Sequence, residues 1–388
     1  MEIENASTLN PVKKIFISTG EQSGDLHTSA LIKELKRDVG TEQIRFYGLG
    51  GDMMSAEGLE LLYHIKELST IGFIDVIKKY GFFRKVLKEC LKKVKEIEPD
   101  VVILVDYPGF NLRFAEELRK FYDKKIIYYI SPQLWAWHTK RVYTIKKCVD
   151  EVMTVFPFEP EFYERFGVNA VYVGHPLVSR IRGFLLENTR KKKIYGDTKI
   201  ITILPGSRKD EITHHLPVLL ETAAQLSKEF DLEVNVSKAD GIDNGAFEKF
   251  SHDLKPYNLS SENVYKMILN SDLVLTKAGT STIECSLIGT PFLIFYRTFA
   301  LNYFLLKPVV KVNNLGMVNI LAGENIIKEF IQHDFTVDNL LLESRKILTD
   351  EHYRTELELK LRRIWDILGS SDAAYSAVKL IKPYLNII

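Results

Sequence analysis

The most informative stretch of the sequence is an unbroken apolar run, Val101–Val105, which ends at Asp106 and is followed by Pro108 and Gly109. Five consecutive β-branched or leucine side chains without polar alternation predict a strand that is buried on both faces, as in the centre of a parallel sheet. Proline and glycine then break the extended run, so the Asp106 carboxylate should stand at the carboxyl end of the strand. Open α/β sheets bind ligands at this edge, although a lone Asp there also serves as a cap or turn residue.

Apolar runs of the same kind recur in two series, separated by the charged and polar stretch 180–199. Most runs are followed by a turn and then by apolar residues at helical spacing, which is the alternation of a parallel sheet with covering helices. The runs predict strands at 15–18, 45–51, 101–105, 125–130, 151–156 and 170–173, and then at 199–204, 272–276 and 291–296. Because 388 residues exceed the usual size of one core, we expect an α/β protein with two parallel-sheet domains.

The first predicted strand leads into the turn Thr19–Asp25, which carries Gly20 and Gly24 and precedes an amphipathic helix. The glycine spacing matches neither the dinucleotide fingerprint nor a Walker-type Gly-Lys-Ser. Backbone N–H groups at the helix start would point towards the ligand edge of the sheet. As a bare glycine turn, however, the segment is weak evidence for binding, because most such turns only close a strand onto a helix.

Polar loops follow three later strands. Ser131–His138 holds two tryptophans, which could stack on a sugar, line an acyl groove or simply pack. Arg208 follows Pro205–Ser207, and its planar guanidinium suits a phosphate, with an ordinary surface arginine as the alternative. The small residues Gly279–Ser281 would let a diphosphate approach a helix N-terminus, and Glu284, one turn later, is placed to accept hydrogen bonds from ribose hydroxyls. Helix capping explains the same residues equally simply.

Composition and charge narrow the class of protein. The formal net charge is only +1, so the chain as a whole does not attract nucleic acid. Its three cysteines lie far apart without metal-type spacing, which favours a reduced, cytosolic compartment. The acidic N-terminus does not resemble a signal peptide. The most apolar region, 286–310, is interrupted by polar and charged residues, so no run reaches the roughly 20 residues that span a bilayer.

One segment, 70–97, combines bulky apolar residues with many lysines. Such a stretch is able to bury its apolar face at the headgroup boundary of a membrane while its lysines contact anionic lipid. The alternative is a helix that packs on the sheet and keeps its lysines in water. The residues that we predict to contact a membrane are Ile71, Phe73, Ile74, Ile77, Phe82 and Phe83.

The motifs together, in their order and spacing from about Lys14 to Phe335, resemble the lipid-A-disaccharide synthase family. The motifs that carry the resemblance are Thr19–Asp25, Asp106–Asn111, Ser131–Trp137, Gly174–Pro176, Leu204–Arg208, Gly279–Glu284 and Asn319–Gly323. The resemblance implies a GT-B glycosyltransferase with two Rossmann-like domains. Its acceptor and membrane-facing domain would be 1–185, its UDP-sugar domain 186–345, and the helices of 346–388 would pack back on an N-terminal domain.

The resemblance also implies the reaction and its partners. Such enzymes join UDP-2,3-diacylglucosamine to 2,3-diacylglucosamine 1-phosphate, which forms the β(1→6) disaccharide of lipid A and releases UDP. They lie peripherally on the inner face of the inner membrane, on its cytoplasmic side, and tend to form homodimers. No cofactor, metal or nucleic acid is expected, and the chain contains no Asp-x-Asp pair.

By the same resemblance, Asp106 corresponds to the essential acid and would act as, or orient, the general base for the acceptor 6-hydroxyl. Arg208 and the helix start at Gly279 would stabilise the diphosphate, and Glu284 would hold the ribose. The remaining residues expected to bind substrate are Glu21, Ser23, Gly24, Asp25, Asn111, Ser131, Thr280, Ser281 and Asn319.

The chain departs from the family at two positions. Gly109 stands where a second acid is frequent, which weakens a paired-carboxylate mechanism, and Lys277 stands where a small or uncharged residue is usual. The lysine would either add a phosphate contact or change a surface. The alternative function is another GT-B enzyme of UDP-N-acetylglucosamine, either a transferase to a polyprenyl-linked acceptor or a UDP-sugar epimerase, and a non-catalytic binding protein is a third reading.

Overall fold

The computed structural model describes residues 11–68, 80–190, 198–239, 242–248, 257–298, 312 and 314–385. By its contacts the chain divides into two compact units. Unit 1 comprises Met1–Pro176 together with Ser371–Ile388, and unit 2 comprises Leu177–Ser370. Each unit is an α/β structure built on its own parallel sheet, as the two series of apolar runs predict.

In unit 1 the described strands form one parallel sheet in the order β3-β2-β1-β4-β5-β6-β7. The strands are β1 (Lys13–Ser18), β2 (Ile44–Gly50), β3 (Leu59–His64), β4 (Val101–Val105), β5 (Lys125–Tyr129), β6 (Glu151–Thr154) and β7 (Ala170–Tyr172). The strand order reverses direction between β1 and β4, and in such sheets the crevice for ligands lies at the carboxyl ends of the strands on either side of that reversal. Ser18 and Val105 end these two strands.

The side chains of β4 alternate between two cores. Val102 and Leu104 join the core under α5 (Tyr80–Ile97), α6 (Pro108–Leu118) and α7 (Val142–Cys148). Val101, Ile103 and Val105 join the core under α1 (Gln22–Val39) and α18 (Ala373–Ile381). All five side chains have no exposed surface, which is why the sequence of this strand shows no polar alternation.

The shorter helices of unit 1 connect these elements. They are η1 (Thr41–Gln43), α2 (Asp52–Ala56), α3 (Ile65–Leu68), η2 (Thr139–Arg141), α8 (Glu159–Glu164) and η3 (Lys382–Leu385).

In unit 2 the described strands are also parallel, in the order β10-β9-β8-β11-β12-β13. They are β8 (Lys199–Leu204), β9 (Leu232–Ser237), β10 (Asn258–Ser260), β11 (Leu273–Lys277), β12 (Phe292–Tyr296) and β13 (Glu329–Ile331). The order reverses between β8 and β11, so the ends of these two strands mark the expected ligand edge of this sheet. The helices are α9 (Pro176–Glu187), α10 (Lys209–Leu226), α11 (Gly245–Glu248), α12 (Val264–Asn270), α13 (Thr280–Ile288), α15 (Met317–Ala322), α16 (Val337–Thr349) and α17 (Glu351–Leu368).

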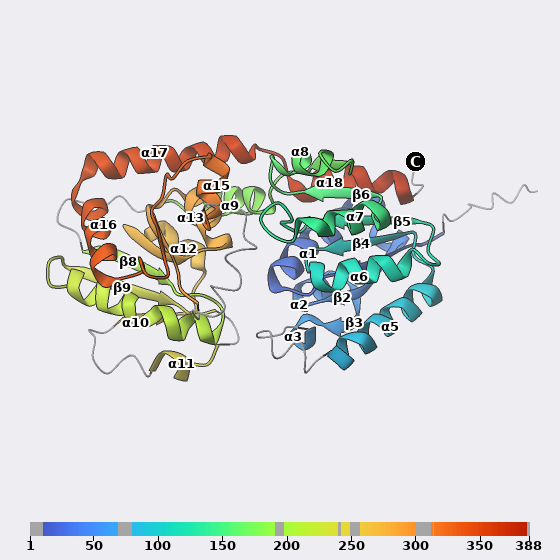
Figure 1. The fold of residues 1–388 in the computed structure, drawn as a ribbon, viewed down its shortest axis with the longest axis horizontal. Helices are drawn as coiled ribbons and strands as arrows, with labels where there is room; N and C mark the ends of the chain where they lie inside the picture. The colour runs from blue at the N-terminus through green and yellow to red at the C-terminus, as the bar shows by residue number, and fades with distance from the viewer. Residues whose placement is uncertain are drawn as a thin grey trace, which may run out of the picture. The chain divides into compact units, whose positions relative to one another are not determined.

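The structure divides the chain nine residues earlier than the expected end of the first domain at 185, because its first unit ends at Pro176. Helix α9 belongs with unit 2, where the Phe184 ring packs edge-on against Tyr265 at 5.5 Å between centroids. Of the segment 346–388, α17 also stays in unit 2, where Trp365 Nε1 donates to the Leu287 carbonyl at 2.9 Å. Only the part from Ser371 onward lies in unit 1, where α18 packs against α1 (Figure 1).

In the segment expected to contact a membrane, Ile71, Phe73, Ile74 and Ile77 lie outside the described residues. Phe82 and Phe83, on α5, are half-buried and pack against the core of unit 1, where the Phe82 ring meets Tyr63 edge-on at 5.8 Å between centroids. Nowhere in the part of the chain that the structure describes is a helix both long and apolar enough to cross a membrane.

The burial of α18 predicts that the C-terminal helix is an integral part of unit 1. Ile381 on this helix has no exposed surface, so Ile381→Ala should lower the free energy of unfolding by about 2–5 kcal/mol through the lost contacts and the cavity. Urea unfolding followed by fluorescence measures the change. Tyr375→Ala is the control, because Tyr375 lies on the same helix and is 45% exposed. Equal midpoints for the two variants would contradict the packing of α18 described here.

Candidate active site

Asp106 lies directly after β4, at the reversal of strand order in unit 1. Asp106 and Tyr107 both have left-handed backbone conformations, with φ of 41° and 50°. Consecutive non-glycine residues in this region are strained, and such strain persists only where the surroundings enforce it. Pro108 then begins α6, in a position where its missing N–H costs nothing. The chain therefore turns sharply at Asp106, as the proline and glycine predict.

Hydrogen bonds from β5, from the residue that follows it and from α6 hold this turn. The Asp106 N–H donates to the Ile130 carbonyl at 3.2 Å. The Asp106 carbonyl accepts from the Tyr128 hydroxyl at 2.6 Å and from Asn111 Nδ2 at 2.8 Å. The backbone of Asp106 is thus fixed by β5 and α6. Its side-chain carboxylate takes no part in these hydrogen bonds.

The side-chain amide of Asn111 is hydrogen-bonded within the protein. Its Oδ1 accepts from the Ser18 hydroxyl at 2.6 Å, and its Nδ2 also lies within hydrogen-bonding distance of the carbonyls of Ser18 and Val105, at 3.2 and 3.1 Å. The residue has no exposed surface. Asn111, expected to bind substrate, therefore ties the ends of β1 and β4 together and places the Asp106 turn.

The environment of Asp106 favours a protonatable carboxyl group. Burial, helped by the negative charge of Glu21, raises the pKa of Asp106 to about 7, against the opposing hydrogen bond of the Tyr107 N–H. Glu21, at the start of α1, is exposed. The close packing depends on Gly20, because a Cβ at this position would lie 2.4 Å from the Tyr107 ring. A carboxyl group whose pKa lies near neutrality is suited to accept a proton from a substrate hydroxyl.

The other expected residues of the first turn differ in what they offer a ligand. Ser23 is half-buried on α1, and Gly24 is buried against the Thr19 side chain. The Asp25 carboxylate accepts from the N–H groups of Gly51, Met53 and Met54 at 2.8, 3.1 and 3.0 Å. These bonds satisfy the backbone N–H groups at the start of α2. In this structure Asp25, which is expected to bind substrate, therefore joins α1 to the end of β2.

The tryptophan loop is anchored by an acid that sequence reasoning missed. Trp135 Nε1 donates to Glu159 Oε1 at 3.0 Å, and Glu159 Oε2 accepts from the N–H groups of Val155 and Phe156 at 3.1 and 3.0 Å. Glu159 has no exposed surface, and burial raises its pKa to about 7 despite these hydrogen bonds. Ser131, which begins the loop, is also buried, whereas Trp137 is 41% exposed. The local signal for Glu159 was an acid that follows the apolar run of β6.

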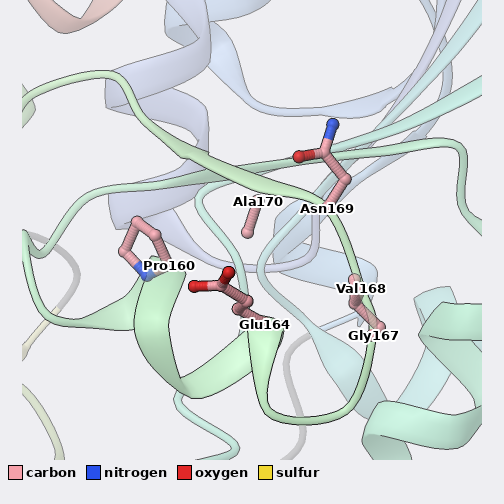
Figure 2. Close-up of a pocket in the computed structure, with 6 residues that line it drawn as sticks. All are labelled: Pro160, Glu164, Gly167, Val168, Asn169 and Ala170. Carbon is pink, nitrogen blue, oxygen red and sulfur yellow. The ribbon is translucent and has the colours of Figure 1, made fainter.

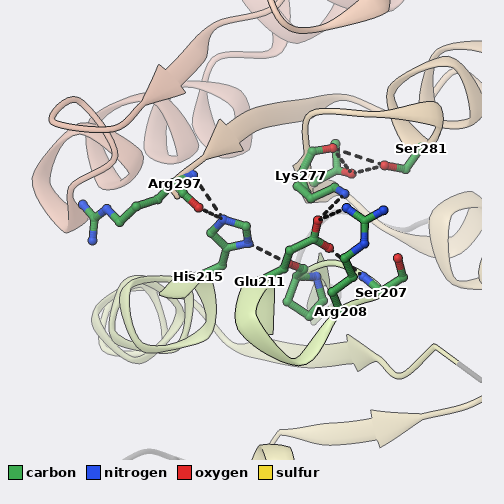
Figure 3. A network of polar contacts seen from close by, with 9 residues as sticks. Ser207, Arg208, Glu211, His215, Lys277, Ser281 and Arg297 are labelled. Atoms are coloured by element: carbon green, nitrogen blue, oxygen red, sulfur yellow. Dashed lines mark hydrogen bonds and ion pairs between the residues drawn. The ribbon is translucent and has the colours of Figure 1, made fainter. Parts of the chain in front are cut away.

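In unit 2, Glu211 on α10 organises the turn that follows β8 (Figure 3). Its Oε2 accepts the Ser207 N–H at 3.0 Å, and its Oε1 accepts from Lys277 Nζ at 2.8 Å. Gly206 makes this approach possible, with φ of 127° and a position where a Cβ would lie 2.4 Å from the Glu211 carboxylate. Arg208 Nη1 lies 3.8 Å from Glu211 Oε1, and the Arg208 side chain is 62% exposed. The turn therefore presents an accessible guanidinium beside an internal ion pair.

His215, one helical turn beyond Glu211, was also missed by sequence reasoning. Its Nδ1 lies 2.7 Å from the Pro205 carbonyl, and its Nε2 lies 2.9 Å from the Arg297 carbonyl and 3.1 Å from the Arg297 N–H. Burial lowers the pKa of His215, although its contacts with the carbonyls of Pro205 and Arg297 oppose the shift. His215 thus joins the end of β8 to the end of β12 (Figure 3).

The start of α13 supplies the second part of this edge. Gly279 is the N-cap residue, Thr280 is exposed, and the Ser281 hydroxyl is paired with Thr276 Oγ1 at 2.6 Å. Glu284, half-buried one turn later, accepts from the Tyr265 hydroxyl at 3.2 Å, and burial raises its pKa. Thr280 and Glu284 are four residues apart and therefore lie on one face of α13, the arrangement expected for a diphosphate and a ribose.

Asn319, in contrast, is turned inward. Its Oδ1 accepts from the Ile327 N–H at 3.0 Å, and its Nδ2 donates to the Ile327 carbonyl and to Glu329 Oε1, both at 2.8 Å. Only 2% of its surface is exposed. In this structure the side chain joins α15 to β13 and has no amide group left for a ligand.

A separate hollow of about 390 Å³ lies between α8 and the start of β7 (Figure 2). It is lined by Pro160, Glu164, Gly167, Val168, Asn169 and Ala170. Because β7 begins at Ala170 and the sheet is parallel, the hollow lies at the amino edge of the sheet, whereas Asp106 lies at the carboxyl edge. It takes no part in the candidate site.

Two parallel-sheet units with polar groups at their carboxyl edges define the GT-B class, which includes glycosyltransferases and sugar-nucleotide epimerases. The fold is similar to that of the UDP-GlcNAc 2-epimerase from Neisseria meningitidis bound to UDP-GlcNAc, with a TM-score of 0.64, 10% identity, and 96% of this chain and 100% of that chain covered. It is also similar to CalG4, the calicheamicin glycosyltransferase, with a TM-score of 0.59, 12% identity, and 97% and 99% covered. At these identities the likeness shows the fold alone.

The sequence identifies the family within this class. Residues 15–375 match the family model LpxB, lipid-A-disaccharide synthetase. The chain is 34% identical over 374 residues to the lipid-A-disaccharide synthase of Geobacter sulfurreducens, which covers 94% of this chain and 95% of the relative. It is also 34% identical over 378 residues to lipid-A-disaccharide synthase 1 of Legionella pneumophila (strain Philadelphia 1), with 95% and 96% covered. The chain belongs to the lipid-A-disaccharide synthase family.

The hydrogen bonds of Asn111 predict a structural cost when its amide is removed. Asn111→Ala leaves the Ser18 hydroxyl and several buried carbonyls without their partner, and should lower the free energy of unfolding by about 1–3 kcal/mol. Urea unfolding provides the measurement. Asn169→Ala, at an exposed asparagine of the same unit, should change the value by less than about 0.5 kcal/mol. A cost no greater than that of the control would show that Asn111 does not hold the turn.

Proposed function

We propose that this chain transfers 2,3-diacylglucosamine from UDP to the 6-hydroxyl group of 2,3-diacylglucosamine 1-phosphate, which yields the β(1→6) disaccharide of lipid A and UDP. The observation that carries the proposal is the match to the lipid-A-disaccharide synthase family and to its named relatives over nearly the whole chain. The fold likeness to 2-epimerases does not favour the alternative enzymes of UDP-N-acetylglucosamine, because it rests on 10% identity.

In the proposed chemistry, Asp106 acts as the general base. Its carboxylate accepts the proton of the acceptor 6-hydroxyl while that oxygen bonds to the anomeric carbon of the donor and the bond from this carbon to the UDP phosphate breaks. The supporting observations are the position of Asp106 at the ligand edge and the pKa of about 7 that its burial produces. A carboxylate with this pKa is a stronger base than an ordinary aspartate and is still substantially ionised at neutral pH.

Unit 2 is the proposed donor domain. Arg208 and the start of α13 would bind the diphosphate, since an exposed guanidinium and unpaired N–H groups at a helix N-terminus both stabilise negative charge. Glu284 would accept hydrogen bonds from ribose hydroxyls. The Tyr265 hydroxyl already donates to one of its oxygens, which orients the carboxylate. Charge that develops on the leaving UDP would be stabilised by the same groups.

For the acceptor, Glu21, Ser23 and Trp137 are accessible or partly accessible residues of the expected motifs in unit 1. Asn111 and Asp25 would instead act by positioning these turns, because their polar atoms are bonded within the protein. Asn319 would play the same positioning role in unit 2.

We also propose that the protein lies peripherally on the cytoplasmic face of the inner membrane. Helix α5 supports this, because Lys85, Lys88, Lys92 and Lys95 are all exposed while Phe82 and Phe83 remain partly accessible. Homodimer formation is a further proposal and rests on the family resemblance alone. Sedimentation velocity of the full chain in detergent would test it.

The role of Asp106 predicts loss of turnover without loss of donor binding. Asp106→Asn should lower kcat by about 100- to 10,000-fold, because the amide cannot accept the proton. Disaccharide formation in detergent micelles with both diacylated substrates, and UDP affinity by calorimetry, are the two measurements. Asp123→Asn is the control, since Asp123 is an exposed aspartate of the same unit. Wild-type turnover in Asp106→Asn would exclude it as the base.

The same assignment fixes the direction of the pH dependence. A base works only when deprotonated, so kcat/KM should rise with pH and level off above the pKa of Asp106, about 7. The comparison uses wild type and Asp123→Asn, which should share this ascending limb. An ascending limb that ends near pH 4, where ordinary aspartates titrate, would contradict the proposed effect of burial.

The membrane proposal predicts a charge-dependent loss of vesicle binding. Each lysine near an anionic surface contributes about 1 kcal/mol, so changing Lys85, Lys88 and Lys92 together to Gln should weaken binding to phosphatidylserine-containing vesicles by roughly 100-fold. Vesicle co-sedimentation measures this. The matched control changes the exposed Lys147, Lys228 and Lys266 to Gln, which alters net charge equally. Equal vesicle binding by the two variants would remove α5 as the membrane-contacting element.

A further inference from the structure

Lys277, the last residue of β11, lies between two parts of the proposed diphosphate site. Its Nζ reaches Glu211, which in turn holds the Ser207 N–H of the turn after β8. A Cβ placed on Gly279 would lie 3.7 Å from Lys277 Cε, so the alkyl chain of the lysine passes beside the first residues of α13. The ammonium group therefore stands where the turn and the helix start meet, on the edge that also carries Arg208 (Figure 3).

The ion pair with Glu211 orients Lys277 without using all of its hydrogen-bond donors. An ammonium group has three N–H donors, and among the described residues Glu211 is the only hydrogen-bond acceptor found for Lys277. The side chain is 22% exposed, whereas that of Glu211 is 11% exposed, so the lysine is the more accessible partner. Two donors are consequently left for a ligand.

The local charge balance favours an anion. Arg208 and Lys277 contribute two positive charges and Glu211 one negative charge, which leaves a net charge of +1 beside a helix N-terminus. Burial alone would discourage ionisation of Glu211, but Lys277, the Ser207 N–H and Arg208 outweigh it, so the pKa of Glu211 lies below its ordinary value. Glu211 therefore stays ionised at neutral pH and holds the Lys277 side chain in place by the ion pair.

We propose that Lys277 directly contacts the diphosphate of the sugar-nucleotide donor, with Glu211 as the residue that positions it. The inference rests on the proposed function for the identity of the ligand, and it deepens that function by adding a cation on β11 to Arg208 on the β8 turn. The two cations lie at the ends of adjacent strands, so they bind the diphosphate from two elements of the sheet.

Calorimetric titration with UDP and with uridine tests the contact, because only UDP carries the phosphates. Lys277→Gln should weaken UDP binding roughly 10-fold or more and leave uridine binding unchanged, since hydrogen bonds between charged groups are the stronger ones. Lys277→Arg, which keeps the charge, should retain most of the UDP affinity. Lys328→Gln is the matched control, because Lys328 forms a similar 2.9 Å pair with buried Glu343 at the opposite edge of the sheet.

A double variant separates contact from repulsion. In Lys277→Gln alone, the unpaired Glu211 carboxylate could itself repel the phosphates. Lys277→Gln combined with Glu211→Gln removes both charges and keeps an amide oxygen to accept the Ser207 N–H. The double variant should remain weak for UDP, and recovery of wild-type UDP affinity would overturn the direct contact.

The remaining outcomes are distinct. Unchanged UDP affinity in Lys277→Gln, or equal weakening of UDP and uridine, would overturn the role of Lys277 and leave the proposed function standing. Failure of the wild-type protein to bind UDP would overturn the proposed donor, and this inference with it. Thermal unfolding of every variant identifies any that do not fold, in which case Lys277→Arg and the double variant carry the test.

Discussion

The constraint on which the candidate site of unit 1 depends is the anchoring of the β4 exit by the Asn111 amide. One side chain bonds the ends of β1 and β4 and the carbonyl of Asp106. Without such bonds, two consecutive left-handed residues at Asp106 and Tyr107 would relax, because this conformation is strained for residues other than glycine. The strained turn aims the carboxylate, and the packing of Tyr107 against Gly20 closes its surroundings. The anchored turn therefore sets both the direction of the Asp106 carboxylate and the burial that raises its pKa.

In unit 2, charged and polar side chains hold the turns at the strand ends. Helix α10 directs two residues, one turn apart, at the turn after β8: Glu211 holds its Ser207 N–H and His215 its Pro205 carbonyl. Each residue then reaches a further strand end, Glu211 through Lys277 on β11 and His215 through Arg297 after β12. One helix thereby fixes three strand exits, and the exits form the edge at which a diphosphate is proposed to bind.

The two units use carboxylates in opposite ways. Burial raises the pKa of Asp106 and of Glu159 to about 7, because among the described residues no cation contributes to offset the loss of water. Glu211 is also buried, but its neighbouring cations hold its pKa below the ordinary value. The first environment suits a group that exchanges a proton, and the second suits a permanent charge that positions a partner. The same chemical group thus serves two purposes according to whether a cation accompanies it.

The sequence by itself determined the central strands and the class of protein, because those depend on local patterns. Strands β3, β9, β10 and β13 were not among the predicted strands. The apolar run Val101–Val105 predicts a strand buried on both faces, and the motifs at the strand exits identify the family. Only the tertiary structure decided which polar residues are accessible. Asp25, Asn111 and Asn319 read as binding residues in sequence, yet their polar atoms are bonded within the protein, to partners as far apart in the chain as Ser18 and Asn111. Glu159 and His215 gave no strong local signal for the same reason. A hydrophobic pattern repeats every two or four residues and is visible in the chain, whereas a hydrogen bond across a sheet joins residues whose proximity exists only once the strands have paired.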